Sequence, residues 1–218
     1  MKKMFKKYNL AKFKNYISLI FLFFCFCLYS FNLSAINITS VQSGRWNQTS
    51  TWDCGCVPSA TDDVTIASGH TVDLRNNTTV NKLTIQSGGM LNCGNNTLTI
   101  NGNLVINGEL NNNRKNIFFN GDTLSGTGIK SGRRRFFFST GTHYIAQGTN
   151  LTFSAGNVHL LTSCTVNNYG SITIVRDLRG ADATSTWTNQ ANSTLKIGRN
   201  MLITGTLNAS ATGNTVEY

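Results

Sequence analysis

The sequence predicts an all-β protein, a single-stranded parallel β-helix or β-solenoid, and three observations carry this prediction. Aliphatic residues recur as pairs spaced by two, such as Leu83 and Ile85, and such a pair faces one side of a strand. The pairs return at spacings typical of solenoid coils, since Leu83 and Leu104 lie 21 residues apart and Ile172 and Leu195 lie 23 apart. Asn and Gly fill the intervals, where Asn side chains stack as ladders from coil to coil.

The other aliphatic pairs place short strands along most of the chain. They are Val64/Ile66, Val72/Leu74, Leu98/Ile100, Leu104/Ile106, Leu151/Phe153, Val158/Leu160, Leu195/Ile197, Ile172/Ile174 and Met201/Ile203. An antiparallel sandwich or barrel is the alternative architecture, with Asn-Gly pairs as its hairpin turns. The shortness of the strands and the returning pairs favour the solenoid.

The composition suits a folded β protein. Hydrophobic residues make up 40% and charged residues 13% of the 218 residues, which is too little charge for a disordered chain. Thr and Asn are abundant, whereas long helices would require Ala, Leu, Glu and Lys.

Residues 1–35 have the organisation of a secretory signal peptide with an N-terminal signal helix. Six lysines precede the apolar run 17–28, and a short segment then ends at Ala35, where we expect cleavage. The apolar run is short for a membrane span, which needs roughly 20 residues. An uncleaved anchor over 17–33 is the alternative. We therefore expect a secreted or cell-surface protein that has no membrane contact after cleavage.

Most of the positive charge lies in this leader. Six of the 19 basic residues belong to it, which leaves 13 basic against 9 acidic residues and a net charge of +4. Nucleic acid is therefore not an expected partner, because the chain-wide basic character disappears with the leader.

Four cysteines follow the leader, and an exported protein can form disulfides from them. These candidates are Cys54, Cys56, Cys93 and Cys164. A bond between Cys54 and Cys56 would strain the usual geometry, so a partner such as Cys93 is favoured. A zinc site with His70 is disfavoured, because a second closely spaced pair of ligands is missing.

One stretch carries a family resemblance. Gly44, Trp46, the pair Thr51-Trp52 and the run 55–66 with Val57-Pro58 and Asp62-Asp63 are similar to the opening of G8-type domains in large secreted proteins of Bacteroidetes. The continuations at 80–104 and 193–218 are also similar. The resemblance implies a right-handed parallel β-helix in a protein exported by the type IX system. It divides the chain into a signal peptide (1–35), an N-terminal cap with Trp46 and Trp52 (36–61) and a β-helix (62–218) that we expect to continue beyond the chain end.

Two residue groups near the start have alternative interpretations. Trp46 and Trp52 either stack on sugar rings or close the first coil as an apolar lid, and the lid is favoured. Asp62, Asp63 and His70 would be acid/base or cation-binding groups, but aspartates before a strand more often accept backbone N–H groups in a turn. Neighbouring strand residues also face opposite sides, which is wrong for a pair of glycosidase carboxylates.

The segment Arg133-Arg134-Arg135, followed by 136–138 of sequence Phe-Phe-Phe, is the candidate binding site. It would bind an acidic polysaccharide or a nucleic acid, with the aromatic residues for stacking. If it binds an acidic glycan, Lys130, Arg176 and Arg179 are expected to join it. The alternative is a solvated loop that leads into a strand with Phe in the core, and a charge run is more often of this kind. His143 and His159 are expected to be ordinary surface or half-buried residues.

The sequence thus favours a non-catalytic structural or adhesive module of a secreted or cell-surface protein. Extracellular polysaccharide or a cell-surface glycan is the candidate partner. No catalytic residue, metal, cofactor or oligomer is predicted. The alternative is a carbohydrate-active β-helix enzyme, a polysaccharide lyase or hydrolase, which would need several of the scattered acidic residues to converge in one groove.

Overall fold

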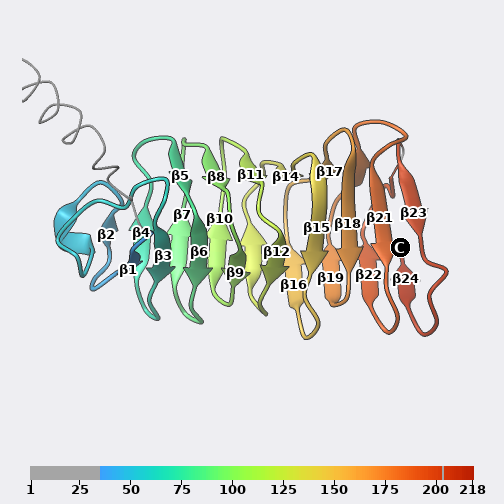
Figure 1. Cartoon of the computed structure of the whole chain (residues 1–218), viewed down its shortest axis with the longest axis horizontal. Coiled ribbons are helices and arrows are strands. Elements are labelled where there is room, and N and C mark those ends of the chain that lie inside the picture. Colours follow the sequence, from blue (N-terminus) through green and yellow to red (C-terminus); the bar gives the residue numbers. More distant parts are fainter. Residues whose placement is uncertain (1–34, 203) are drawn as a thin grey trace, which may run out of the picture. The chain divides into compact units, whose positions relative to one another are not determined.

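The computed structural model describes residues 35–202 and 204–218. The predicted signal peptide, apart from Ala35, and Ile203 lie outside the described residues. The described part is a parallel β-solenoid, and Figure 1 shows its short strands stacked coil upon coil. It contains 24 strands and one 3-10 turn, η1 (Thr49–Thr51). The prediction of an all-β solenoid is confirmed.

Each strand belongs to one of three parallel sheets that form the faces of the solenoid. The first sheet contains β1 (Asn37–Thr39), β3 (Asp63–Ile66), β6 (Lys82–Ile85), β9 (Leu104–Ile106), β12 (Thr123–Ser125), β15 (Gly141–Ile145), β18 (Cys164–Asn168), β21 (Thr186–Asn189) and β23 (Thr206–Asn208). The second sheet contains β2 (Gly44–Arg45), β4 (Thr71–Asp73), β7 (Met90–Asn92), β10 (Glu109–Asn111), β13 (Ile129–Ser131), β16 (Asn150–Phe153), β19 (Ser171–Ile174), β22 (Thr194–Ile197) and β24 (Thr215–Glu217). The third sheet contains β5 (Thr78–Val80), β8 (Leu98–Ile100), β11 (Ile117–Phe119), β14 (Phe136–Phe138), β17 (Val158–Leu160) and β20 (Leu178–Gly180).

The chain visits the three sheets in turn, so that each strand pairs with the strand one coil earlier. Leu83 pairs with Leu104, and Ile172 pairs with Leu195, as the repeat spacing predicts. The paired strands are parallel throughout the described part, and an isolated bridge between Ser40 and Trp52 is the antiparallel contact there. The antiparallel sandwich is therefore wrong.

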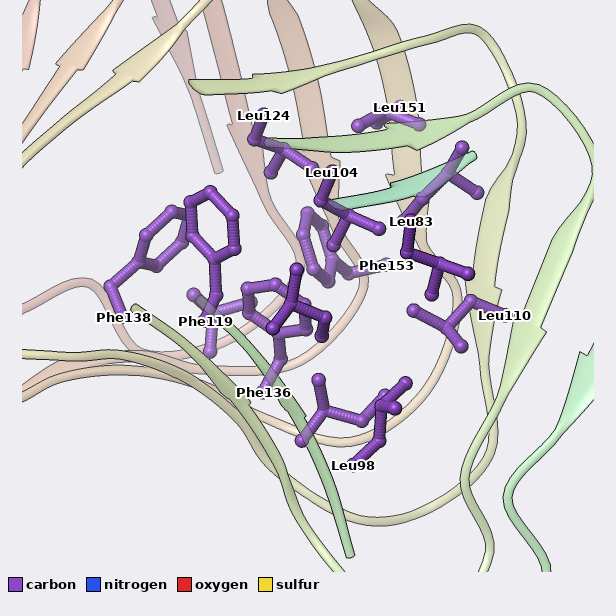
Figure 2. Close-up of a cluster of buried hydrophobic side chains, with 14 of the residues drawn as sticks. Leu83, Leu98, Leu104, Leu110, Phe119, Leu124, Phe136, Phe138, Leu151 and Phe153 are labelled. Atoms are coloured by element: carbon purple, nitrogen blue, oxygen red, sulfur yellow. The ribbon is translucent and has the colours of Figure 1, made fainter. Parts of the chain in front are cut away.

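The interior is a continuous column of apolar side chains. Strand alternation buries one side chain of every two, so that Leu83, Leu104 and Leu124 of the first sheet lie on successive coils. In Figure 2 they face Phe119 and Phe136 of the third sheet across the interior. Because each side chain packs on the coils before and after it, the core extends through the stack.

The coils start before residue 62. Strands β1 and β2 lie within the segment 36–61 and already pair with β3 and β4. Trp46 and Trp52, which are 4% and 2% exposed, pack edge to face with their ring centroids 4.9 Å apart. Trp52 Nε1 donates a hydrogen bond to the Trp46 carbonyl oxygen at 2.8 Å. Both rings are thus core residues of the first coil with no face open to a sugar.

Close stacking of the corners explains part of the glycine content. A Cβ placed on Gly121 would lie 1.7 Å from the carbonyl oxygen of Gly102, one coil earlier. A side chain at that position is therefore excluded by the backbone beneath it.

No helical segment in the described ranges is long and apolar enough to span a membrane.

Candidate functional site

The arginine run lies where the chain turns from the second sheet to the third. Arg133, Arg134 and Arg135 connect β13 to β14, and all three side chains are exposed. Their main chain is stacked on the coil below, because Arg134 N donates to the Asn112 carbonyl oxygen at 3.2 Å and Ile117 N donates to that of Arg135 at 3.1 Å. The run is therefore part of the solenoid wall, with its guanidinium groups directed outward.

The same corner carries basic residues on other coils. Exposed basic side chains between a second-sheet strand and the third sheet define what we call the basic corner: Arg75, Arg114, Lys115, Arg133, Arg134, Arg135, Arg176 and Arg199. Arg199 follows β22. It lies at this corner because Met201, two residues later, bridges to Leu178 of β20. The basic corner thus holds 8 of the 13 basic residues that follow the leader.

Most of these charges lack a carboxylate neighbour. Arg75 lies 3.6 Å from Asp73, and the other ion pairs in the described ranges involve Lys82, Arg179 and Lys196. Within 35–202 and 204–218, no other member of the basic corner forms a salt bridge. The corner is therefore a line of positive charge that remains available to an anion.

An aromatic ladder borders this corner on the outer face of the third sheet. Phe118, Phe137, His159 and Arg179 occupy the same register position on successive coils. The rings of Phe118 and Phe137 are nearly parallel at 9°, with centroids 5.0 Å apart, and His159 follows at 5.1 Å. The neighbours Phe136 and Phe138 point inward instead. Phe137 thus lies on the outer face of the third sheet but is only 9% exposed between Phe118 and His159, and the other two residues of the run belong to the core.

The geometry of the ladder limits what it can bind. Phe118 and Phe137 cover each other's faces, so the ring edges rather than the faces point outward. Ring edges carry partial positive charge and therefore favour an anion. The ladder and the basic corner thus form one surface suited to negatively charged groups.

Burial and neighbouring charges set the protonation states of His159, in the aromatic ladder, and of Asp177 beside it. Burial, together with the nearby charges of Arg135 and Arg179, lowers the pKa of His159 to about 4, although the carboxylate of Asp177 acts in the opposite direction. His159 is therefore neutral at pH 7. Arg179 Nε donates to Asp177 Oδ2 at 3.0 Å. Burial would raise the pKa of Asp177, but hydrogen bonds from Arg179 and Asn200 hold it below its ordinary value.

Lys130, Arg176 and Arg179 were expected to lie on the same surface as the arginine run, and Arg176 does. It is exposed in the basic corner, two coils from the run. Arg179 is half-buried in the third sheet and paired with Asp177. Lys130 is 1% exposed and faces the interior, so its placement in a surface patch is wrong.

The cysteines differ from the expected pairing. Cys54 is bonded to Cys56, and Cys93 and Cys164 are free and buried. Gly55, with a φ of 60°, allows the tight turn between the bonded residues, so the expected pairing of one of them with Cys93 is wrong. Burial raises the pKa of both free thiols to about 12, so both are inert.

The remaining polar candidates have local partners. Asp62 accepts hydrogen bonds from Ser59 N and Oγ, each at 2.7 Å, and His70 Nδ1 lies 2.9 Å from Ser40 Oγ. His143 is buried, which corrects its assignment as a surface or half-buried residue. Among the described residues, no three His, Cys, Asp or Glu side chains gather as they would around a metal ion.

Sequence reasoning missed Arg75, Arg114, Lys115 and Arg199, which are far apart in the chain. Each follows the second-sheet strand of its own coil and precedes the third sheet. Aligning the coils by their aliphatic pairs would have placed them in one column. Phe118 would have been found in the same way, as the residue one coil before Phe137.

A comparison with protein-family models finds a match to the G8 domain over residues 51–191. Neither the curated proteins nor the solved structures contain a significant match. The matched range includes Trp52, the arginine run and the aromatic ladder.

Proposed function

Because the chain belongs to the G8 domain family, we propose that it is a non-catalytic structural or adhesive module that holds a linear acidic polysaccharide along the basic corner. One observation carries the proposal: eight exposed basic side chains lie at one corner of the solenoid, on five of the seven coils from that of Arg75 to that of Arg199. Rigid coils fix the spacing of these charges before any ligand arrives. Such preorganisation reduces the entropy lost on binding.

The length of the corner favours a polymer over a small anion. From the coil of Arg75 to that of Arg199 there are six coil steps, or about 29 Å at about 4.8 Å per step. At physiological ionic strength charges are screened beyond about 8 Å. A small anion would therefore interact with one or two coils, whereas an extended polyanion contacts cations along the whole corner.

A polysaccharide is favoured over nucleic acid for a physical reason. Single-stranded nucleic acids bind largely by stacking bases on aromatic faces. Phe118 and Phe137 stack on each other and His159 packs on Phe137, which reduces that contribution. The carboxylate or sulfate groups of a glycan bind instead to cationic side chains and to the edges of aromatic rings.

The setting we propose is extracellular. The signal-like leader and the similarity to large secreted proteins of Bacteroidetes support export, by the type IX system, to the cell surface or medium. We also propose a right-handed winding, because parallel crossovers are right-handed in about 98% of cases.

Binding of polygalacturonate to the purified chain tests the proposal, with neutral dextran and single-stranded DNA as comparison ligands. The variant Arg133→Gln/Arg134→Gln/Arg135→Gln removes three charges from the corner. The control Arg45→Gln/Lys82→Gln/Lys196→Gln removes three charges from other places. The corner variant should bind polygalacturonate about 100-fold more weakly at low salt, taking about 1 kcal/mol per cation.

The control should keep its affinity within about twofold, because its charges lie outside the corner. Equal losses in both variants would mean that net charge alone attracts the polymer, and the proposal would fail. Stronger binding of single-stranded DNA than of polygalacturonate would instead assign the corner to nucleic acid.

A further inference from the structure

One cation of the corner segment faces the interior. Lys130 lies on β13 between Leu110 of the coil below and Phe153 of the coil above, and its side chain is 1% exposed. In the same strand the apolar Ile129 points outward and is 45% exposed. This arrangement is opposite to the one that hydrophobicity would produce, so the interior must offer the ammonium group specific partners.

Three carbonyl oxygens supply these partners. Lys130 Nζ donates to the carbonyl oxygens of Gly132 at 3.2 Å, Arg134 at 2.8 Å and Ala155 at 3.1 Å. Two of them belong to the turn that presents the arginine run, and the third belongs to the coil above. The ammonium group therefore ties the main chain of the basic corner to the next coil from inside.

The backbone at this place leaves little room for another arrangement. Gly132 has a φ of 87°, and a Cβ on Gly156 would lie 2.1 Å from the Arg134 carbonyl oxygen. On the coil below, Asn112 Nδ2 donates to the carbonyl oxygens of Lys115 at 3.0 Å and Arg135 at 3.2 Å. Lys130 and Asn112 thus hold the corner turn from two adjacent coils.

The protonation state of Lys130 decides whether all three carbonyl groups are satisfied. An ammonium group has three N–H donors, one for each acceptor, whereas a neutral amine has two. Burial lowers the pKa of Lys130 to about 7, and Cys93 would oppose this shift only as a thiolate. Since burial raises the pKa of Cys93 to about 12, Cys93 is a neutral thiol in this range.

We propose that Lys130 is a positioning residue for the basic corner: its ammonium group holds the turn that presents Arg133, Arg134 and Arg135 to an acidic polysaccharide, and its deprotonation releases that turn. This inference rests on the proposed function. Loss of one donor leaves a buried carbonyl group unpaired, and the turn then opens to reach water. Binding of the polymer and protonation of Lys130 therefore strengthen each other.

The first measurement uses the full chain without ligand. NMR follows the Lys130 Cε resonance and the amide exchange of residues 132–135 between pH 5.5 and 9. The turn should exchange faster above the Lys130 transition near pH 7, relative to the general base-catalysed increase measured for residues 82–85 of β6. Unchanged relative exchange through that transition would overturn the positioning role.

The second measurement is the affinity for polygalacturonate over the same pH range at constant ionic strength. Arginine stays charged and the uronate carboxylates stay ionised throughout, so neither changes the result. The affinity should fall roughly fivefold to tenfold with a midpoint near the Lys130 transition, about the effect of one hydrogen bond. The variant Lys130→Met should bind with no such transition, whereas Arg45→Gln should retain it.

The two measurements separate the two proposals. A turn that opens near pH 7 in a chain that binds no polygalacturonate at any pH would overturn the proposed function and leave the positioning role intact. Binding with a flat pH profile in the unmodified chain would overturn the positioning role, whatever the stability of Lys130→Met.

Discussion

Asn168 donates a hydrogen bond from Nδ2 to Asn189 Oδ1 at 3.0 Å, in the interior of the solenoid. Both side chains are fully buried and occupy positions that aliphatic residues fill on earlier coils. Asn189 also accepts from Trp187 Nε1 at 3.0 Å and donates to the Thr215 carbonyl oxygen at 3.1 Å. The pair therefore connects the first sheet to the backbone of the second.

Replacing both members of this pair should cost less than the sum of the two single replacements. Asn189→Leu leaves Trp187 Nε1 without its acceptor and removes the bond from Asn168 Nδ2 to Asn189, although Asn168 Nδ2 still donates to the Thr194 carbonyl oxygen. We expect a loss of about 2–3 kcal/mol in the free energy of unfolding. The double variant with Asn168→Leu should lose less than the sum of the single variants. Urea unfolding measures both.

The exposed pair Asn101 and Asn120 provides the control for this prediction. Asn120 Nδ2 donates to Asn101 Oδ1 at 2.9 Å on the surface. Asn120→Ala should change stability by less than about 0.5 kcal/mol. Additive losses for the two interior variants would contradict the interpretation of Asn168 and Asn189 as one hydrogen-bonded unit.

The Cys54–Cys56 disulfide should contribute little to stability. It closes a loop of three residues, for which loop-closure entropy gives about 1.6 kcal/mol, against about 3.9 kcal/mol for a bond from Cys54 to Cys93. Cys54→Ser/Cys56→Ser should therefore lose at most about 1.6 kcal/mol in urea unfolding. Under native conditions Cys93 and Cys164 should resist iodoacetamide, and rapid alkylation of either would contradict their burial.

The sequence predicts the position of a residue well where residues nearby in the chain determine its environment, and poorly where other coils determine it. Leu83 and Leu104 were placed on adjacent coils because an apolar residue every second position is a local signal. Lys130, Asn168 and Asn189 could not be placed, since alternation of apolar residues gives no reason to turn them inward. Their interior positions depend on carbonyl groups from neighbouring coils, such as Ala155 for Lys130, and the sequence of one strand does not contain that information.

The candidate site was predictable to a similar degree. Arg133, Arg134 and Arg135 were recognised because they are adjacent in the chain. Arg199 joins them through the register of β19 and β22 and the bridge from Met201 to Leu178, which depend on the length of every intervening corner. Irregular corner lengths conceal the column of cations until the coils are aligned.

Acid should weaken the fold through His159. Its pKa is about 4 in the folded chain and about 6.5 when unfolded, so the unfolded chain binds more protons between these values. The stability contribution is complete above pH 6.5 and is lost as the pH falls toward 4. His159→Phe should flatten the decrease in the free energy of unfolding over this window, and curves that stay parallel to the unmodified chain would contradict the assignment.

Phe137 should matter for stability rather than for binding. It lies between Phe118 and His159, and Phe137→Ala removes two ring contacts, for a loss of about 3 kcal/mol in the free energy of unfolding. Its faces are covered, so polygalacturonate affinity should stay within about twofold. A tenfold loss of affinity in a folded Phe137→Ala chain would show that the sugar contacts the ring face.

The length of the ligand should decide which cations contribute to binding. Three coil steps, or about 14 Å, separate the coil of Arg133 from that of Arg199. Oligogalacturonates too short to span this distance should bind Arg176→Gln/Arg199→Gln as well as they bind the unmodified chain. Long polymers should bind that variant about 30-fold more weakly, at about 1 kcal/mol per cation. Arg45→Gln/Lys196→Gln is the matched control and should affect neither class. Equal losses for short and long ligands would mean that the cations act as separate sites, because a continuous site requires one polymer to contact them together.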